Sequence, residues 1–132
     1  QLVSDYLQPF LTKIESNKKH TIYFLHKPSK IILPIEINNI LDKTTEDTYI
    51  RTLKALNAEI ISIHLYLYLD DIYYVYLKIK ANDEFYDINS SITNAMYILE
   101  NIPSTEVFVE KAILQTEGIK ITRELLEKSL LF

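Results

Sequence analysis

The chain has 132 residues, of which 48% are hydrophobic and 24% charged, and its formal net charge is −4. This length and balance fit one globular domain, residues 1–132, and exclude a disordered chain. The absence of cysteine excludes disulfides and thiolate chemistry, and the acidic balance argues against a broad nucleic-acid surface. Since no apolar run predicts a membrane span and the N-terminus shows no signal-peptide pattern, we expect a cytoplasmic protein with no membrane partner.

The first 37 residues predict three strands. Residues 9–15 form a short extended segment that begins at Pro9, and residues 21–25 are β-branched and aromatic. The sequence His26-Lys27-Pro28-Ser29 is typical of a turn, and residues 30–37 are again apolar, so residues 21–37 predict a hairpin.

A helix is expected to follow the polar connection after Ile37. Thr44 or Thr45 can cap it, and Glu46 and Asp47 suit the positive end of its dipole. Apolar residues follow at helical spacing, and Asn57 is a residue that readily adopts the left-handed conformation that ends helices.

Residues 59–69 and 72–80 predict an antiparallel hairpin around Asp70-Asp71. Strict alternation would place one aliphatic set on one face and a histidine with four tyrosines on the other. The predicted aliphatic set is Ile61, Ile63, Leu65, Leu67, Leu69, Val75, Leu77 and Ile79, with Tyr73 on the same parity.

The remaining elements continue an α+β order. We expect a strand over residues 84–88, a helix from Ser90 or Ser91 to Asn101, a strand over 106–109 and a helical turn over 111–116. Gly118 is predicted to end that turn in the left-handed conformation, and a last helix to span residues 122–131. The predicted fold is a mostly antiparallel sheet with helices packed on it.

The predicted tyrosine face consists of Tyr66, Tyr68, Tyr74 and Tyr76. We favour a homo-oligomer interface for it, because amphipathic rings are common between subunits. Two alternatives remain open at this point. The rings can stack on the bases of a nucleic acid, or helices can cover them while the aliphatic face forms the interface.

Four short motifs occur in an order that resembles the bifunctional nuclease (DNase/RNase-type) domain family. They are ILPIEI at 32–37, TEDTYIRTLKALNAEI at 45–60, YDINSSITNAMYILENIP at 86–103 and VFVEKAILQTEGI at 107–119. The resemblance covers about residues 10–120. It implies a nuclease that hydrolyses DNA or RNA phosphodiesters with a divalent metal, Mg²⁺ or Mn²⁺.

The resemblance also implies site residues. It places Thr45, Asp47, Asp87 and Ser91 at catalytic positions, and the metal ligands would be Asp47, Asp87 and Glu36. The chain departs from the family pattern at several positions. Ile92 stands where the family has Asp, Asn89 and Ser90 replace an Arg-Pro pair, and a segment that carries a Glu is absent after Ile37.

Structural explanations compete with these catalytic roles. Asp47 and Ser91 lie where helix caps and dipole partners are common, whereas Asp87 at a strand end is harder to explain by structure alone. The alternative function is therefore a non-catalytic member of the same fold that oligomerises or binds a ligand. The two functions differ in one geometric requirement: a nuclease needs Asp47, Asp87 and Glu36 in one cleft.

Overall fold

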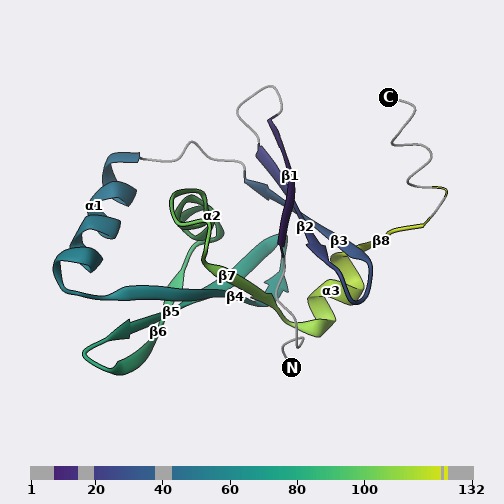
Figure 1. Cartoon of the computed structure of the whole chain (residues 1–132). Coiled ribbons are helices and arrows are strands. Elements are labelled where there is room, and N and C mark those ends of the chain that lie inside the picture. The colour runs from purple at the N-terminus through teal and green to yellow at the C-terminus, as the bar shows by residue number, and fades with distance from the viewer. Residues whose placement is uncertain (1–7, 15–19, 38–42, 123, 125–132) are drawn as a thin grey trace.

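A computed structural model describes residues 8–14, 20–37, 43–122 and 124 of the chain. Its elements, in chain order, are β1 (Gln8–Ile14), β2 (His20–His26), β3 (Ile31–Ile37), α1 (Lys43–Ala55), β4 (Glu59–Leu69), β5 (Ile72–Ala81), β6 (Glu84–Ser90), α2 (Ile92–Asn101), β7 (Glu106–Val109), α3 (Lys111–Glu117) and β8 (Ile119–Lys120). The predicted α+β class is confirmed (Figure 1). The predicted last helix, 122–131, lies outside the described residues except for Thr122 and Glu124.

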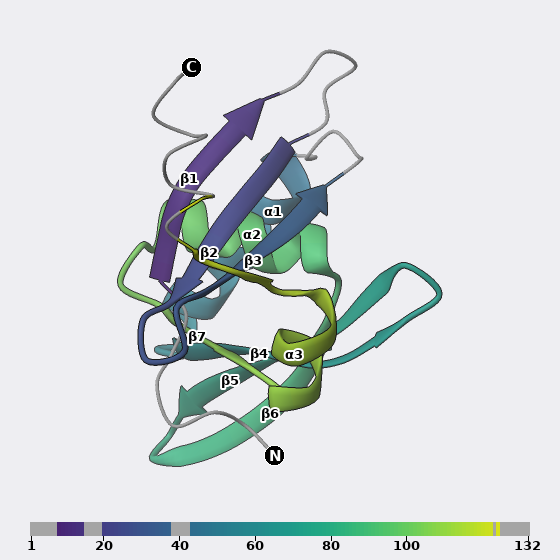
Figure 2. The same cartoon turned by 90° about the vertical axis from the view of Figure 1, so that its right-hand side faces the viewer.

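The strands form two four-stranded sheets, where the sequence pattern had suggested one. Their orders are β1-β2-β3-β8 and β6-β5-β4-β7, and all strand pairs are antiparallel except β4 with β7. Figure 2 shows the first sheet in front of α2, with the second sheet below it. Helix α3 contacts both β3 and β4, so it links the two sheets.

One hydrophobic core joins these layers. It combines Phe24, Leu33 and Ile35 of the first sheet with the inner face of the second sheet and with α2. Leu65 is fully buried in this core, as predicted. Among the described residues, no helix combines the length and the apolar character that crossing a membrane requires.

The β4–β5 hairpin is confirmed, and so is its tight turn. Asp70 and Asp71 have φ values of 51° and 63°, the left-handed pair that a two-residue turn of this hairpin type needs. Asn57 is also left-handed after α1, with φ 56°, as expected. The helix itself begins at Lys43, so Thr44 and Thr45 lie inside its first turn and not before it.

The strict alternation predicted for β4 is wrong, because the strand contains two bulges. The register shifts between Ile60 and Ser62 and again between Leu65 and Leu67. Each shift inserts one residue and reverses the parity of the side chains that follow. Tyr68 therefore pairs with Tyr73 on the core side, while Leu67 and Leu69 become 42% and 53% exposed.

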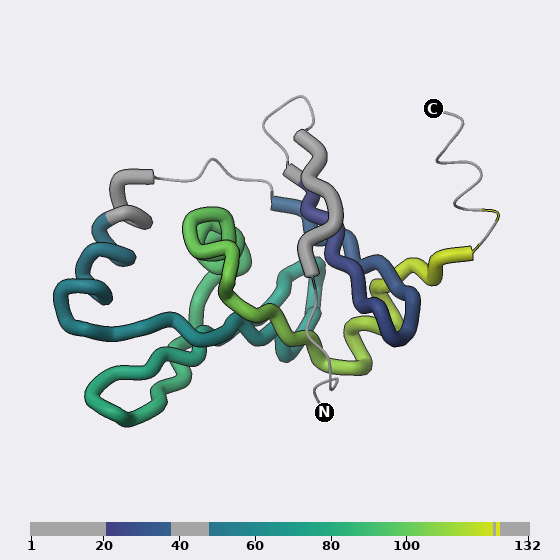
Figure 3. Tube along the Cα trace, viewed as in Figure 1, coloured from purple at the N-terminus to yellow at the C-terminus, as the bar shows by residue number. Residues whose placement is uncertain are grey.

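Gly118 ends α3, but its conformation differs from the prediction. Its φ is −77° and its ψ 155°, which is extended backbone that any residue can adopt. A Cβ at this position would overlap Ile31 Cγ2 and the backbone oxygen of Leu114. The position requires glycine because β3 and the end of α3 approach closely (Figure 3). The left-handed conformation that glycine can adopt is not the reason.

Candidate functional site

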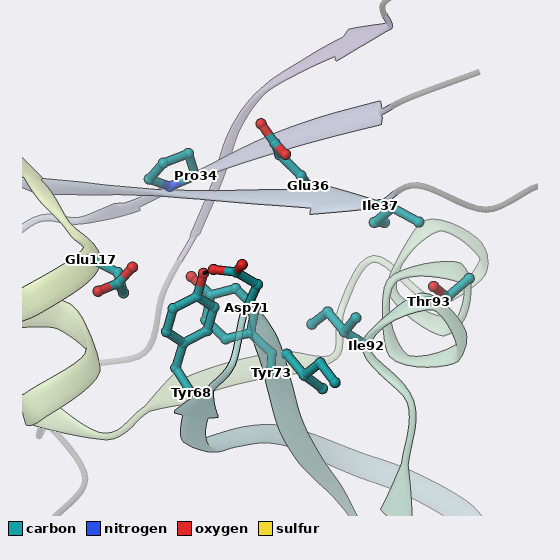
Figure 4. Close-up of a pocket in the computed structure, with 10 residues that line it drawn as sticks. Pro34, Glu36, Ile37, Tyr68, Asp71, Tyr73, Ile92, Thr93 and Glu117 are labelled. Carbon is teal, nitrogen blue, oxygen red and sulfur yellow. Dashed lines mark hydrogen bonds between the residues drawn. The ribbon is translucent and has the colours of Figure 1, made fainter. Parts of the chain in front are cut away.

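An open cleft of about 690 Å³ lies between the two sheets, where four elements meet. Strand β3 forms one wall, the β4–β5 turn forms the floor, and the start of α2 and the end of α3 close the two ends (Figure 4). The lining residues are Pro34, Glu36, Ile37, Tyr68, Asp71, Ile72, Tyr73, Ile92, Thr93 and Glu117.

Two tyrosine rings form the aromatic floor of the cleft. The ring centroids of Tyr68 and Tyr73 lie 4.4 Å apart at an angle of 46°. Both residues are partly buried. Tyr73 points to this side of the sheet with Val75 and Leu77 of β5, and Tyr68 joins it because the bulge at Tyr66 shifts the register of β4. The predicted tyrosine face must be corrected accordingly: Tyr68 does not belong to it.

Three carboxylates line the same cleft as this ring pair, each from a different element. Asp71 comes from the β4–β5 turn and Glu117 from the end of α3, while Glu36 projects from β3 on the side turned away from the rings (Figure 4). The Tyr68 hydroxyl donates a hydrogen bond of 3.2 Å to Asp71 Oδ1.

The pKa values of the two phenols reflect these surroundings. Burial raises the pKa of Tyr68, and the hydrogen bond to Asp71 and the negative charges of Asp71, Glu117 and Glu36 raise it further. Burial is also the main cause that raises the pKa of Tyr73, followed by Tyr68 and Glu117. Both phenols therefore stay neutral at physiological pH, and the negative charge of the cleft comes from the carboxylates.

This arrangement suits an organic cation better than a metal ion. Among the described residues that line the cleft there is no Lys, Arg or His to neutralise the carboxylates. In the same described part of the chain, no three His, Asp or Glu side chains lie close enough together to hold a metal ion. Carboxylates spread around aromatic rings and apolar walls instead match an ammonium group carried on a hydrocarbon chain.

The structure places two of the predicted metal ligands on opposite sides of the second sheet. Glu36 lines the cleft on the inner side. Asp87 lies on β6 opposite Lys78, whose neighbours Leu77 and Ile79 point into the core, so Asp87 points outward. Its electrostatic partners, His64 and Tyr76, lie on the same outer face. Glu36 and Asp87 do not share a cleft.

The remaining predicted residues lie at helix starts. Ser91 caps α2, and its hydroxyl accepts a hydrogen bond of 3.0 Å from the Asn94 backbone nitrogen. This confirms the structural role that competed with the catalytic one. Thr45 and Asp47 lie in the first turns of α1, and their side chains fall outside what the structure describes. Ile92 presents an apolar side chain to the cleft where the family has Asp.

Sequence reasoning missed Asp71, Glu117 and the Tyr68–Tyr73 pair as members of one site. The sequence predicts a turn at Asp71, and it contains Glu117 within the quoted motif at 107–119, where the resemblance implies no role for it. The available signal was the crowding of tyrosines and acidic residues near the hairpin turn. That signal becomes specific only when the bulge reverses the parity of Tyr68.

Comparison of the chain with protein-family models and with curated proteins found no match. The resemblance to the bifunctional nuclease domain family accordingly stays an expectation that rests on the four quoted motifs.

Proposed function

We propose that this domain is a non-catalytic ligand-binding module whose cleft takes an alkylammonium group. The observation that supports it is that Glu36, Asp71 and Glu117 line the same cleft as the Tyr68–Tyr73 ring pair, with no basic residue among the described lining residues. Such a group would place its charge among the carboxylates and over the ring faces. Its hydrocarbon chain would pack on the apolar wall that Ile37 and Ile92 contribute.

The ammonium group has two sources that share this chemistry: a free diamine, or a lysine side chain of a peptide. The cleft is open, and β8 pairs with β3 only at Ile31 and Ile32, so the edge of β3 along the cleft can also accept an extended peptide and the walls alone do not choose between the two sources. Putrescine and Nα-acetyl-lysine amide are therefore the two probes, and calorimetric titration against each distinguishes the sources. Tighter binding of putrescine would identify a free diamine as the ligand class.

Neutralising the cleft is expected to weaken amine binding. Each surface ion pair contributes ~0.2–1 kcal/mol, so Glu36→Gln should lower the affinity for putrescine by up to about fivefold. The double variant Glu36→Gln/Glu117→Gln should lower it by up to about 25-fold, the product of two such losses, because the two carboxylates come from different elements that line the cleft.

Asp87→Asn is the matched control, since it removes the same charge from the opposite side of the sheet. It should leave the affinity for putrescine unchanged. Equal losses of putrescine affinity in Asp87→Asn and Glu36→Gln would show that only the net charge of the chain attracts the amine. Tight binding of Mg²⁺ that competes with putrescine would also contradict the proposal, because it would make the cleft a metal site.

The resemblance implies a metal-assisted nuclease, and this alternative function has a separate test. We expect no cleavage of single-stranded DNA or RNA above the blank, with or without Mg²⁺ or Mn²⁺, because Glu36 and Asp87 lie on opposite sides of a sheet. The assay uses the full chain, Asp87→Asn and Asp47→Asn. Metal-dependent cleavage that both substitutions abolish would establish the nuclease and refute a non-catalytic domain.

A further inference from the structure

The outer face of the β6-β5-β4-β7 sheet carries large apolar side chains that are accessible to solvent. Helix α2 covers the other face of this sheet through its contact with β5 (Figure 1). We call the apolar patch the set that lies near the β4–β5 turn: Tyr66, Leu67, Leu69 and Tyr74, which are 37%, 42%, 53% and 39% exposed. Phe85, which is 59% exposed, lies opposite Lys80 at the other end of this face.

The bulge between Leu65 and Leu67 creates much of this patch. Without it, Leu67 and Leu69 would follow Leu65 into the core. With it, they join a cluster in which the Tyr66 ring lies 6.5 Å from the Tyr74 ring and 5.6 Å from the Tyr76 ring. The patch is therefore a consequence of a specific backbone feature that turns two leucines toward solvent.

A buried histidine lies at the centre of the outer face. The His64 ring is 6% exposed and stacks between Tyr76 and Phe108, at centroid distances of 4.5 and 5.1 Å. Its Nε2 lies 2.7 Å from Ser62 Oγ. Burial lowers the pKa of His64, the charge of Lys78 lowers it further, and Asp87 opposes them, so the ring is neutral near pH 7.

Most charges on this face are paired by sign across neighbouring strands. Lys78 lies opposite Asp87 and Lys80 opposite Glu59, while Glu106 lies opposite the uncharged Ser62. These strand positions therefore carry two lysines and three carboxylates, which is close to neutral, while the whole chain carries −4. Two copies of an acidic chain meet the least repulsion where such a neutral face approaches its own copy. A nucleic acid, in contrast, needs unpaired cations that release counterions from phosphates.

The area of the patch also suits a second copy. The four side chains together expose on the order of 300–400 Å², within the ~300–600 Å² of the largest patch on a typical monomer. One side of a standard interface buries ~800 Å², and the patch together with its partly buried rim of Tyr76, Lys78 and Lys80 is smaller than that, which is the size typical of a weak, reversible dimer. An isologous contact needs only this one surface, since each copy presents the same patch.

We propose that this chain self-associates through the outer face of the β6-β5-β4-β7 sheet, with a second copy covering the apolar patch. This surface lies on the opposite side of the sheet from the amine-binding cleft, so the two proposals fail independently. Tyr66 and Tyr74 would lie at the centre of the contact, and Tyr68 would take no part in it.

Sedimentation velocity from about 1 to 100 µM tests this interface. The full chain should sediment as a dimer at the upper concentrations. Leu69→Glu introduces a charge into the patch at an exposed position, and it should weaken the dimer at least about 30-fold, because a buried unpaired charge at an interface is costly. Leu56→Glu, at a 66% exposed leucine at the end of α1, should leave the dimer unchanged.

Three outcomes would overturn the interface. The first is a full chain that remains monomeric at 100 µM, and the second is an equal loss of dimer in Leu69→Glu and Leu56→Glu. The third is salt-sensitive binding of single-stranded RNA by a monomer, lost in a Tyr66→Ala/Tyr74→Ala variant, which would make the face a base-stacking platform. Circular dichroism melting of each variant separates loss of contact from loss of fold.

Discussion

Replacing Leu65 by alanine is expected to lower the free energy of unfolding by about 2–5 kcal/mol. Leu65 is fully buried, lies opposite Val75, and belongs to the core that joins both sheets to α2. The substitution removes its apolar contacts and leaves a cavity that the surrounding strands fill only in part. Urea unfolding followed by circular dichroism measures the change.

Leu67→Ala is the control that makes this experiment specific. The same substitution two residues later removes a side chain that is 42% exposed, so it should cost less than about 1 kcal/mol. Urea unfolding should be measured at low protein concentration, where self-association does not contribute to stability. Equal decreases in the free energy of unfolding for Leu65→Ala and Leu67→Ala would mean that β4 follows strict alternation and has no bulge between these residues.

Substituting Gly118 by alanine is expected to destabilise the domain by about 1–3 kcal/mol, the usual cost of forcing extra atoms into a packed site. The new Cβ would overlap Ile31 Cγ2 and the Leu114 backbone oxygen, and a backbone atom has no rotamer through which to move away. Since the glycine already has φ −77°, the expected loss is steric and no conformational strain contributes.

A second substitution on α3 separates packing from helix propensity. Gln115→Ala, at an exposed position of the same helix, should leave the stability unchanged or slightly raised. Combining Gly118→Ala with Ile31→Ala would remove one of the two overlapping groups. Recovery of part of the lost stability in that double variant, measured by thermal unfolding, would identify Ile31 as the obstructing side chain. An unchanged stability of the Gly118→Ala variant would contradict the close approach of β3 and α3.

Local signals in the sequence were sufficient for the elements and their order. The Asp70-Asp71 pair between two β-branched and aromatic runs predicted the hairpin, because these residues tolerate the left-handed conformations of a tight turn. Ser91 predicted the start of α2, because its hydroxyl can satisfy a backbone N–H at the helix end. These effects act over a few residues, so no knowledge of distant packing is needed to predict them.

Only the tertiary structure decided which side chains meet. A bulge depends on how β4 pairs with β5, and one inserted residue moved Tyr68 into the cleft and Leu67 out of the core. The acidic cleft gathers Glu36, Asp71 and Glu117 from three elements, and it forms only because the two sheets pack through α2 and α3. The same packing separates Glu36 from Asp87, since a sheet lies between them. Sequence spacing carries no record of such long-range pairings, and they determine the site.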